Sequence, residues 1–354
     1  MKEIELDKRG QEILEAIVKS YVETGEPVGS RSISRLTREG LSAATVRNVM
    51  ADLEDRNLLT QPHASAGRVP TDKAYRLYVD SLMKARRLPE AEQRAIESVL
   101  QGVPAEFNDL LSSVSRLLSR HSRHMGVVVS PRLSRLRVRD LEFVRLGPHR
   151  ILLILVSASG AIHNKMVELA EDHEQEKLDK LGRYLTQEFS GHTLQEIRDQ
   201  ILERMGQEKA LYDSLLRDAL ALGQASLSEE AAGTGREEDV FVDGTANLLS
   251  EPEFSSVERL KSLFRTFEEK HELLRMLNSC LEETAGGVRV LIGSENTSPG
   301  LSDCTLVASP YGAQGATLGT LGIIGPTRME YARAIALVDS VARMLSHALT
   351  RYQG

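Results

Sequence analysis

Arg47 and Asn48 carry side chains that could recognise the edges of DNA bases. An arginine guanidinium can donate two parallel hydrogen bonds to guanine O6 and N7, and an asparagine amide can pair with adenine N6 and N7. Small side chains at Ala43, Ala44 and Ala51 would let the backbone come close to another surface. Taken alone, this pattern is more typical of an ordinary amphipathic helix, so the interpretation depends on the neighbouring segments.

A helix is predicted within residues 41–59, with Arg47 and Asn48 on its exposed face. Ser42 is expected to cap its N-terminus. The buried stripe is formed by apolar residues at i, i+3, i+4 and i+7, namely Val46, Val49, Met50 and Leu53.

Charge is distributed unevenly along this predicted helix. The acidic residues Asp52, Glu54 and Asp55 occupy its second half, where DNA phosphates would repel them. We therefore expect only the N-terminal half to enter a major groove. Its candidate contacts are Ser42, Ala43, Ala44, Thr45, Arg47 and Asn48. Thr45 and Ser42 could donate to phosphates, although Thr45 could instead serve only as a local cap.

Two further helices are expected before residue 41. The first spans residues 7–25, has a double-width apolar stripe and ends at a glycine. A short second helix begins at Ser30 or Ser32, with Ile33 and Leu36 facing inward. The order of helix, short helix, glycine turn and helix is that of a helix-turn-helix.

A β-hairpin wing is expected after the third helix, with strands at residues 58–61 and 68–70. Arg68 is predicted to contact a phosphate or the minor groove. Ser65 and His63 in the connecting loop are further candidates, although a lone loop histidine is equally often only solvated. Arg31 and Arg35 in the second helix would add positive charge beside the DNA.

The N-terminal segment as a whole is electrically neutral. Residues 1–84 contain 13 lysines and arginines and 13 aspartates and glutamates. A positive face must therefore come from the placement of charges, and one copy alone should bind DNA weakly. A dimer on an inverted repeat would follow, because a two-fold axis in the protein matches a two-fold axis in the DNA.

The remainder of the chain predicts an α+β architecture. Strand patterns occur in two groups, over residues 126–169 and 288–325, and a helix closes the chain. The expected domains are a winged helix-turn-helix at 1–88, a discontinuous sheet domain at 89–170 and 282–354, and a mostly helical insertion at 171–281. Within the insertion, 223–238 is expected to be a mobile loop and 254–281 a long helix.

Enzymatic, metal and cofactor roles are not indicated. Cys280 and Cys304 are the only cysteines, and they lack metal-ligand spacing. No metal-ligand spacing on a common helix face is shown by His121, His124, His149, His163, His173 and His192. The chain shows neither a secretory segment nor an apolar run long enough to span a membrane. With a net charge of -7 it is not expected to coat nucleic acid nonspecifically, and a reduced cytoplasmic location is expected.

Five segments carry a family resemblance. They are GEPVGSRSIS, LSAATVRNVMADLEDRNLL, QPHASAGRVPTDKAYRLYVD, FVDGTANLL and GTLGIIGPTRMEYARAIALVDSVARML. Together they resemble the HrcA family, bacterial heat-shock repressors with a winged-helix N-terminus. The resemblance implies a GAF-like second domain, an insertion that makes the homodimer, and binding to the inverted-repeat CIRCE operator upstream of chaperonin operons.

Two hypotheses remain for what the sheet domain senses. The resemblance implies that repression depends on the GroE chaperonin and that heat inactivates the repressor, so the domain would report its own folding state. The alternative is a metabolite-controlled repressor with an effector in the GAF-like pocket. The sequence identifies no ligand for such a pocket.

Overall fold

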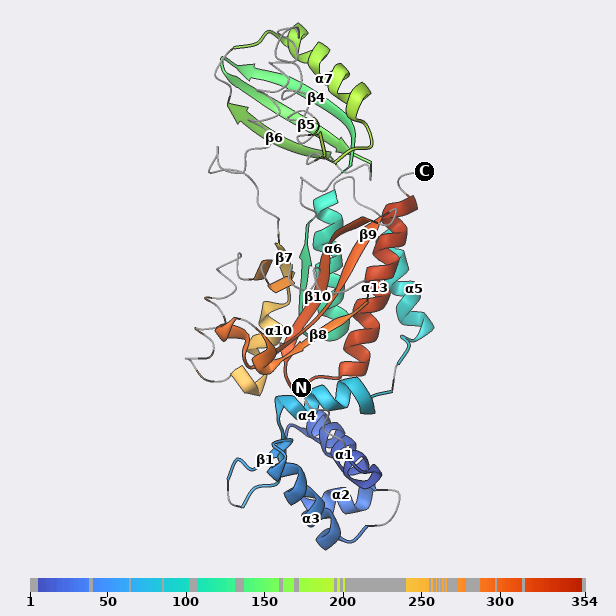
Figure 1. Cartoon of the computed structure of the whole chain (residues 1–354), viewed down its shortest axis with the longest axis vertical. Helices are drawn as coiled ribbons and strands as arrows, with labels where there is room; N and C mark the ends of the chain where they lie inside the picture. The colour runs from blue at the N-terminus through green and yellow to red at the C-terminus, as the bar shows by residue number, and fades with distance from the viewer. Residues whose placement is uncertain are drawn as a thin grey trace.

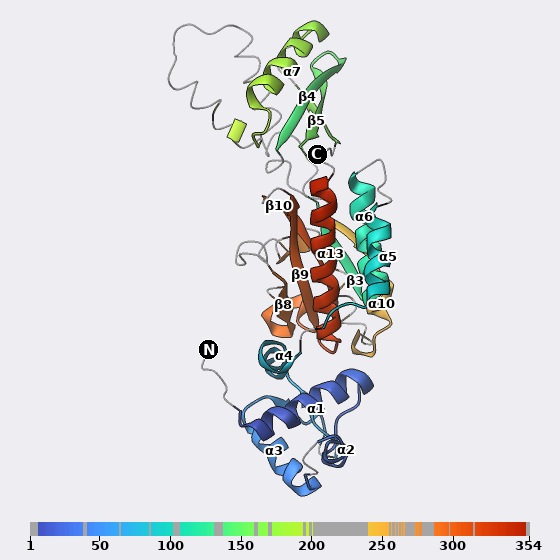
Figure 2. The ribbon, with the colours of Figure 1, turned by 90° about the vertical axis from the view of Figure 1, so that its right-hand side faces the viewer.

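The computed structural model describes residues 6–37, 41–63, 65–84, 86–101, 107–130, 137–158, 162–168, 172–193, 240–254, 287–296, 298–313 and 316–351, with scattered positions at 196–200 and 256–277. These parts form three tiers along one long axis (Figures 1 and 2). A small helical domain with a two-stranded hairpin lies at one end and a five-stranded sheet in the middle. A three-stranded sheet lies at the other end.

The N-terminal tier has the predicted winged-helix order. Its elements are α1 (Lys8–Thr24), α2 (Ser30–Leu36), α3 (Ala43–Asp55), β1 (Leu59–Thr60), β2 (Val69–Pro70) and α4 (Asp72–Leu77), which continues as one π-helical turn, Tyr78–Leu82. The Asp7 carboxylate caps α1 by accepting from the Gly10 N–H at 2.8 Å, and Gly25 ends it with φ 71. The predicted ends of this helix are confirmed.

Of the two α2 residues predicted to face inward, one is buried and the other is exposed. Ile33 is fully buried, whereas Leu36 is 60% exposed, so its predicted burial is wrong. The helix ends at Leu36, and the extended residue Thr37 takes the inward position, with only 7% exposure. Gly40, the expected end, lies outside the described residues.

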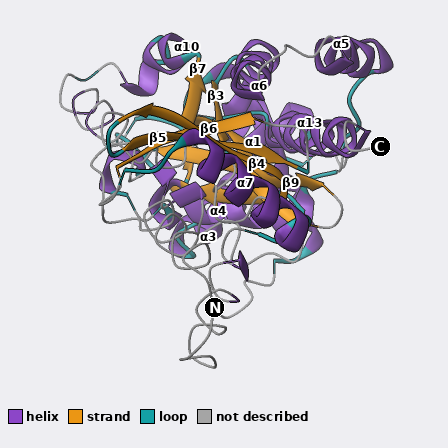
Figure 3. Cartoon of the chain, turned by 90° about the horizontal axis from the view of Figure 1, so that it is seen from above, coloured by secondary structure: helices purple, strands orange, loops and turns teal. Residues whose placement is uncertain are grey.

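The middle tier is a five-stranded antiparallel sheet with helices on both faces. The strands run in the order β7-β3-β10-β9-β8. In chain order the elements are α5 (Glu90–Gln101), α6 (Phe107–Ser122), β3 (Met125–Val129), β7 (Val240–Asp243), α10 (Thr245–Leu249), β8 (Arg289–Ile292), β9 (Cys304–Ala313), β10 (Ala316–Pro326) and α13 (Tyr331–Arg351). Helix α5 lies at the periphery, beyond α13 (Figures 1 and 3).

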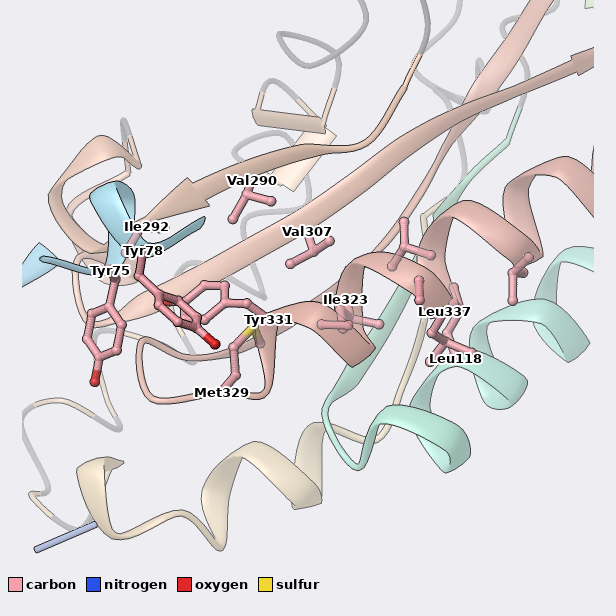
Figure 4. Packing of buried hydrophobic residues seen from close by; sticks show 14 of the residues in the cluster. Tyr75, Tyr78, Leu118, Val290, Ile292, Val307, Ile323, Met329, Tyr331 and Leu337 are labelled. Carbon is pink, nitrogen blue, oxygen red and sulfur yellow. The ribbon is translucent and has the colours of Figure 1, made fainter. Parts of the chain in front are cut away.

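Alternation along β3 shows how the two faces are filled. Val128 packs with residues of α6 and α13, whereas Val127 and Val129 pack on the opposite side with Leu248 and Phe254. Each strand therefore contributes to two apolar layers, which is why these strands are rich in aliphatic residues. Leu118, Ile323 and Leu337 meet in the layer between the sheet and its two long helices (Figure 4).

The distal tier differs from the predicted domain boundaries. β4 (Val138–Gly147), β5 (Arg150–Ser157) and β6 (Ile162–Glu168) form a separate three-stranded sheet, covered on one face by α7 (Gln175–Phe189). The expectation that these strands join the same sheet as residues 126–130 is wrong. β3 already pairs with β10 on one side and β7 on the other, so it has no free edge for β4.

The insertion in the middle tier therefore includes residues 137–193 rather than starting at 171. Residues 240–243, expected within the insertion, belong to the five-stranded sheet as β7. The predicted loop 223–238 lies outside the described residues. The predicted helix 254–281 is described only at scattered positions, which are helical between 259 and 277. Among the helices that the structure describes, none is long and apolar enough to cross a bilayer.

His124, at the turn between α6 and β3, predicts an acid-sensitive fold. Burial, together with the charge of Arg328, lowers the pKa of His124 from 6.5 to about 4. Because the unfolded chain then takes up the proton first, stability is intact above pH 6.5 and falls as the pH drops towards 4. The loss should reach on the order of 2–3 kcal/mol. Melting temperatures at pH 7 and pH 4.5 should differ less in His124→Leu than in the unmodified protein. Equal pH responses of the two proteins would contradict this assignment.

Candidate nucleic-acid interface

The N-terminus of α3 is closed by two hydroxyl side chains. The Ser42 Oγ accepts a hydrogen bond from the Thr45 N–H at 3.1 Å, which confirms Ser42 as the N-cap. The Ser42 Oγ also lies 2.9 Å from the Thr45 Oγ1, so the two hydroxyls bond to each other. The local role considered for Thr45 is therefore present in the structure.

The outer face of α3 presents the predicted donors. Arg47, Asn48 and Ala44 are exposed, and Ala43 and Thr45 are half-buried. The inner stripe is confirmed, since Val46, Met50 and Leu53 are buried and Val49 packs against them. In the described part of the chain, neither Arg47 nor Asn48 has a hydrogen bond or an ion pair. Both side chains are thus available to an external ligand.

Helix α2 is held beside the start of α3. The Ser34 Oγ donates to the Leu41 carbonyl at 2.6 Å, which ties α2 to the turn that precedes the cap. Arg31 and Arg35 are exposed and four residues apart, so they share one face of α2. Figure 1 shows α2 and α3 together at the extreme end of the molecule.

The wing has one more backbone connection than the sequence indicated. β1 and β2 pair antiparallel, with Leu59 opposite Pro70. Val28, in the segment before α2, exchanges two backbone hydrogen bonds of 2.9 Å with Arg68. The base of the wing is therefore anchored to the helix-turn-helix, while His63 and Ser65 near its tip are exposed.

Arg68 is engaged within the domain. Its guanidinium forms an ion pair of 2.8 Å with Glu54 near the end of α3, and its side chain is only 22% exposed. Glu54 was expected to lie on the part of α3 that avoids phosphates, but its ion pair with Arg68 was not predicted. A DNA phosphate would therefore have to share Arg68 with Glu54.

Three features of the described residues bear on metal binding, thiol chemistry and cavities. These residues contain no group of three His, Cys, Asp or Glu side chains that could hold a metal ion. Burial raises the pKa of the Cys304 thiol to about 12, which leaves it unreactive at neutral pH. Two hollows of about 430 and 470 Å³ lie along α5 and α13, lined by residues such as Gln93, Ser340 and Arg343.

A capped third helix with free arginine and asparagine side chains, a short second helix beside it, and an anchored hairpin define a winged-helix DNA-binding protein. Residues 5–82 match the family model described as winged helix-turn-helix transcription repressor, HrcA DNA-binding. Residues 108–335 match the model of the HrcA protein C terminal domain. The chain belongs to the HrcA family of heat-inducible transcription repressors, which confirms the family resemblance.

Curated relatives align over nearly the whole chain. The heat-inducible transcription repressor HrcA of Geobacter sulfurreducens is 43% identical over 345 residues, covering 98% of each chain. The protein of the same name from Syntrophobacter fumaroxidans is 40% identical with the same coverage. A crystal structure described as that of a hypothetical protein superposes with a TM-score of 0.60 and 19% identity, covering 98% of this chain and 100% of that one. This likeness shows a shared fold.

Proposed function

We propose that this chain represses transcription in the cytoplasm as a homodimer that binds an inverted-repeat operator, with one α3 in each half-site. The observation that carries the proposal is the exposed N-terminal half of α3, with unpaired Arg47 and Asn48 side chains above a fully packed inner face. The family resemblance of the sequence implies that this operator is the CIRCE element of chaperonin operons.

Each candidate contact has a distinct role in this proposal. Arg47 contacts guanine and Asn48 contacts adenine, while Ala43 and Ala44 allow the helix to approach the groove. Arg31 and Arg35 contact phosphates beside the groove, and His63 and Ser65 contact the flanking backbone from the wing. Ser42 keeps the helix N-terminus formed and directed at the phosphates, with Thr45 bonded to it. Arg68 contacts a phosphate only while it also remains paired with Glu54.

The uncovered face of the distal sheet is the proposed dimer surface. Four large apolar side chains are exposed on the β4–β6 sheet, namely Val144 (36%), Leu146 (52%), Ile162 (67%) and Met166 (53%). Val144, Leu152 and Met166 lie opposite one another in register, and α7 packs on the other face. Exposed apolar patches of this kind are typical of protein interfaces, because burying them releases ordered water.

Met166→Glu is expected to weaken the dimer by at least about tenfold in dissociation constant, because a carboxylate buried without a partner costs more than 1.4 kcal/mol. Sedimentation equilibrium measures this. Gln187→Glu, on the exposed face of α7, adds the same charge on the opposite side of the sheet and should leave the dimer unchanged. Equal dimer affinity in both variants would count against the distal surface.

The regulatory part of the proposal is that heat unfolds the repressor and that the GroE chaperonin restores it. Footprinting on a fragment with the inverted repeat, using protein refolded with and without chaperonin, tests both DNA binding and chaperonin dependence. A protected repeat only after chaperonin treatment is the expected result. The metabolite alternative predicts instead that a small molecule raises the melting temperature by mass action.

A further inference from the structure

Two arginines cross between the winged helix and the sheet domain, one from each side. Arg76 in α4 donates from Nε to Glu295 Oε1 at 2.8 Å and from Nη2 to the Val290 carbonyl at 2.6 Å. Its Nη2 also contacts Glu295 Oε2, and its Nη1 donates to Asp80 Oδ1 at 3.2 Å. Glu295 belongs to the 3-10 turn Gly293–Glu295 that follows β8. A bidentate arginine pair of this kind fixes direction as well as distance.

Arg328 makes the reciprocal contact from the sheet domain. It lies in the turn between β10 and α13 and donates from Nη1 to the Val22 carbonyl, in the last turn of α1, at 3.2 Å. Its Nε is held by Glu253 at 2.6 Å, and Glu251 lies 3.5 Å from Nη2. A cation at this position also interacts favourably with the C-terminal end of the helix dipole. We call the Arg76 and Arg328 contacts the two clamps.

A glycine stands at each clamp. Gly293 has φ +52, and a Cβ there would lie 2.3 Å from the Asp72 carboxylate, which accepts the Ser294 N–H at 2.9 Å. Gly25 has φ +71 and lies against the Arg328 guanidinium, with 3.4 Å from the Cβ position to Cζ. The first glycine is required for close approach and the second for the helix end.

Apolar residues fill the space between the clamps. The rings of Tyr75 in α4 and Tyr331 in α13 have centroids 5.6 Å apart, and both side chains are nearly fully buried. Figure 4 shows Tyr75, Tyr78, Met329 and Tyr331 gathered at this junction. Because the junction holds this apolar contact, the two clamps and the bond between Asp72 and Ser294, the winged helix cannot rotate on the sheet domain without breaking at least one of them.

We propose that the two clamps determine which half-site spacing the repressor accepts, by fixing the orientation of each winged helix on the dimer core. The inference rests on the proposed function, a dimer on an inverted repeat. Each added base pair moves a half-site by about 3.4 Å and rotates it by roughly one tenth of a turn. A rigid arm cannot follow that displacement unless the DNA is deformed, whereas a winged helix released from its clamps can.

Arg76 and Arg328 act through α3 rather than on DNA, so they are positioning residues. Arg76 lies in α4 and bonds to Glu295 and Val290 of the sheet domain, and Arg328 lies in the sheet domain and bonds to Val22 of α1. Their loss should therefore leave contacts within one half-site unchanged. Spacing tolerance distinguishes this role from a merely structural one.

The experiment compares the full-length protein with the double variant Arg76→Ala, Arg328→Ala on operators whose half-sites are moved by one or two base pairs, and on a single half-site. The unmodified protein should lose about tenfold or more in affinity per base pair of displacement. The double variant should vary by less than about threefold across the series, with unchanged single half-site affinity. Arg94→Ala removes an exposed arginine that pairs with Glu90 within α5, and this variant should depend on half-site spacing as the unmodified protein does.

The charge exchange Arg76→Glu with Glu295→Arg, made together with Arg328→Ala, guards against a folding defect. It restores the ion pair of one clamp without the bond to the Val290 carbonyl, and affinity should again fall when the half-sites are displaced. The proposal would be overturned if the affinity of the double variant fell with half-site displacement as steeply as that of the unmodified protein. It would also be overturned if the double variant tolerated displacement and the charge exchange did not restore the loss of affinity. An unmodified protein that ignores the inverted repeat altogether would instead refute the proposed function.

Discussion

Arg47→Ala is expected to lower operator affinity by about 5- to 150-fold for each half-site, which corresponds to the roughly 1–3 kcal/mol that a bidentate arginine–guanine pair contributes. The side chain is exposed and has no partner in the described part of the domain, so its removal should not disturb the fold. Because a dimer carries two copies, the free-energy loss on a full inverted repeat should be about twice that on one half-site.

The loss should be specific to one base. A titration at fixed salt, with operators substituted at each position, should show that Arg47→Ala no longer discriminates guanine at a single place in each half-site. Arg47→Lys keeps the charge without the fork of donors, so it should keep the salt dependence and lose the discrimination. Asp52→Asn, on the second half of the same helix, should change the base preference nowhere. Unaltered base preference in Arg47→Ala would remove this residue from the base contacts.

Tyr75→Ala is expected to destabilise the junction by about 3–5 kcal/mol, the usual cost of deleting a fully buried aromatic ring. Tyr75 packs against Tyr331, and its hydroxyl has no hydrogen-bond partner among the described residues. Burial also raises the pKa of this hydroxyl, in keeping with its dry surroundings. Removing only the hydroxyl should therefore cost nothing.

Tyr75→Phe is the matched variant, and it should be as stable as the unmodified protein or more stable by about 1–2 kcal/mol, because an unsatisfied buried hydroxyl is lost. Calorimetric unfolding of the three proteins at neutral pH makes the comparison. A Tyr75→Phe protein that unfolds as early as Tyr75→Ala would show that the hydroxyl has a stabilising contact.

The N-terminal domain could be predicted closely because its determinants are local. Asp7 and Ser42 accept hydrogen bonds from backbone N–H groups three residues further on, and Gly25 adopts the left-handed conformation that ends a helix. The inner stripe of α3 follows from helical spacing alone. Leu36 departs from the prediction because periodicity does not show where a short helix ends.

That the distal strands form a separate sheet could not be predicted, because it depends on the distant strands β10 and β7 that occupy both edges of β3. The alternation of Leu141 and Phe143 with exposed residues identifies a strand, but it does not say which sheet that strand joins. The two clamps could not be predicted from the sequence for the same reason, since Arg76 and Glu295 are 219 residues apart in the chain. The pair of Arg68 with Glu54 joins two elements whose separate roles the sequence did suggest.

The recognition helix and the uncovered distal sheet lie at opposite ends of one long molecule (Figure 1). If two copies join at the distal sheet, the contact between them lies far from both copies of α3. A small change of angle at the dimer contact then displaces α3 by a large distance. Increased thermal motion at any point between the dimer contact and α3 would be magnified at the DNA. Simultaneous binding to both half-sites would then be lost at a lower temperature than the one at which either winged helix unfolds.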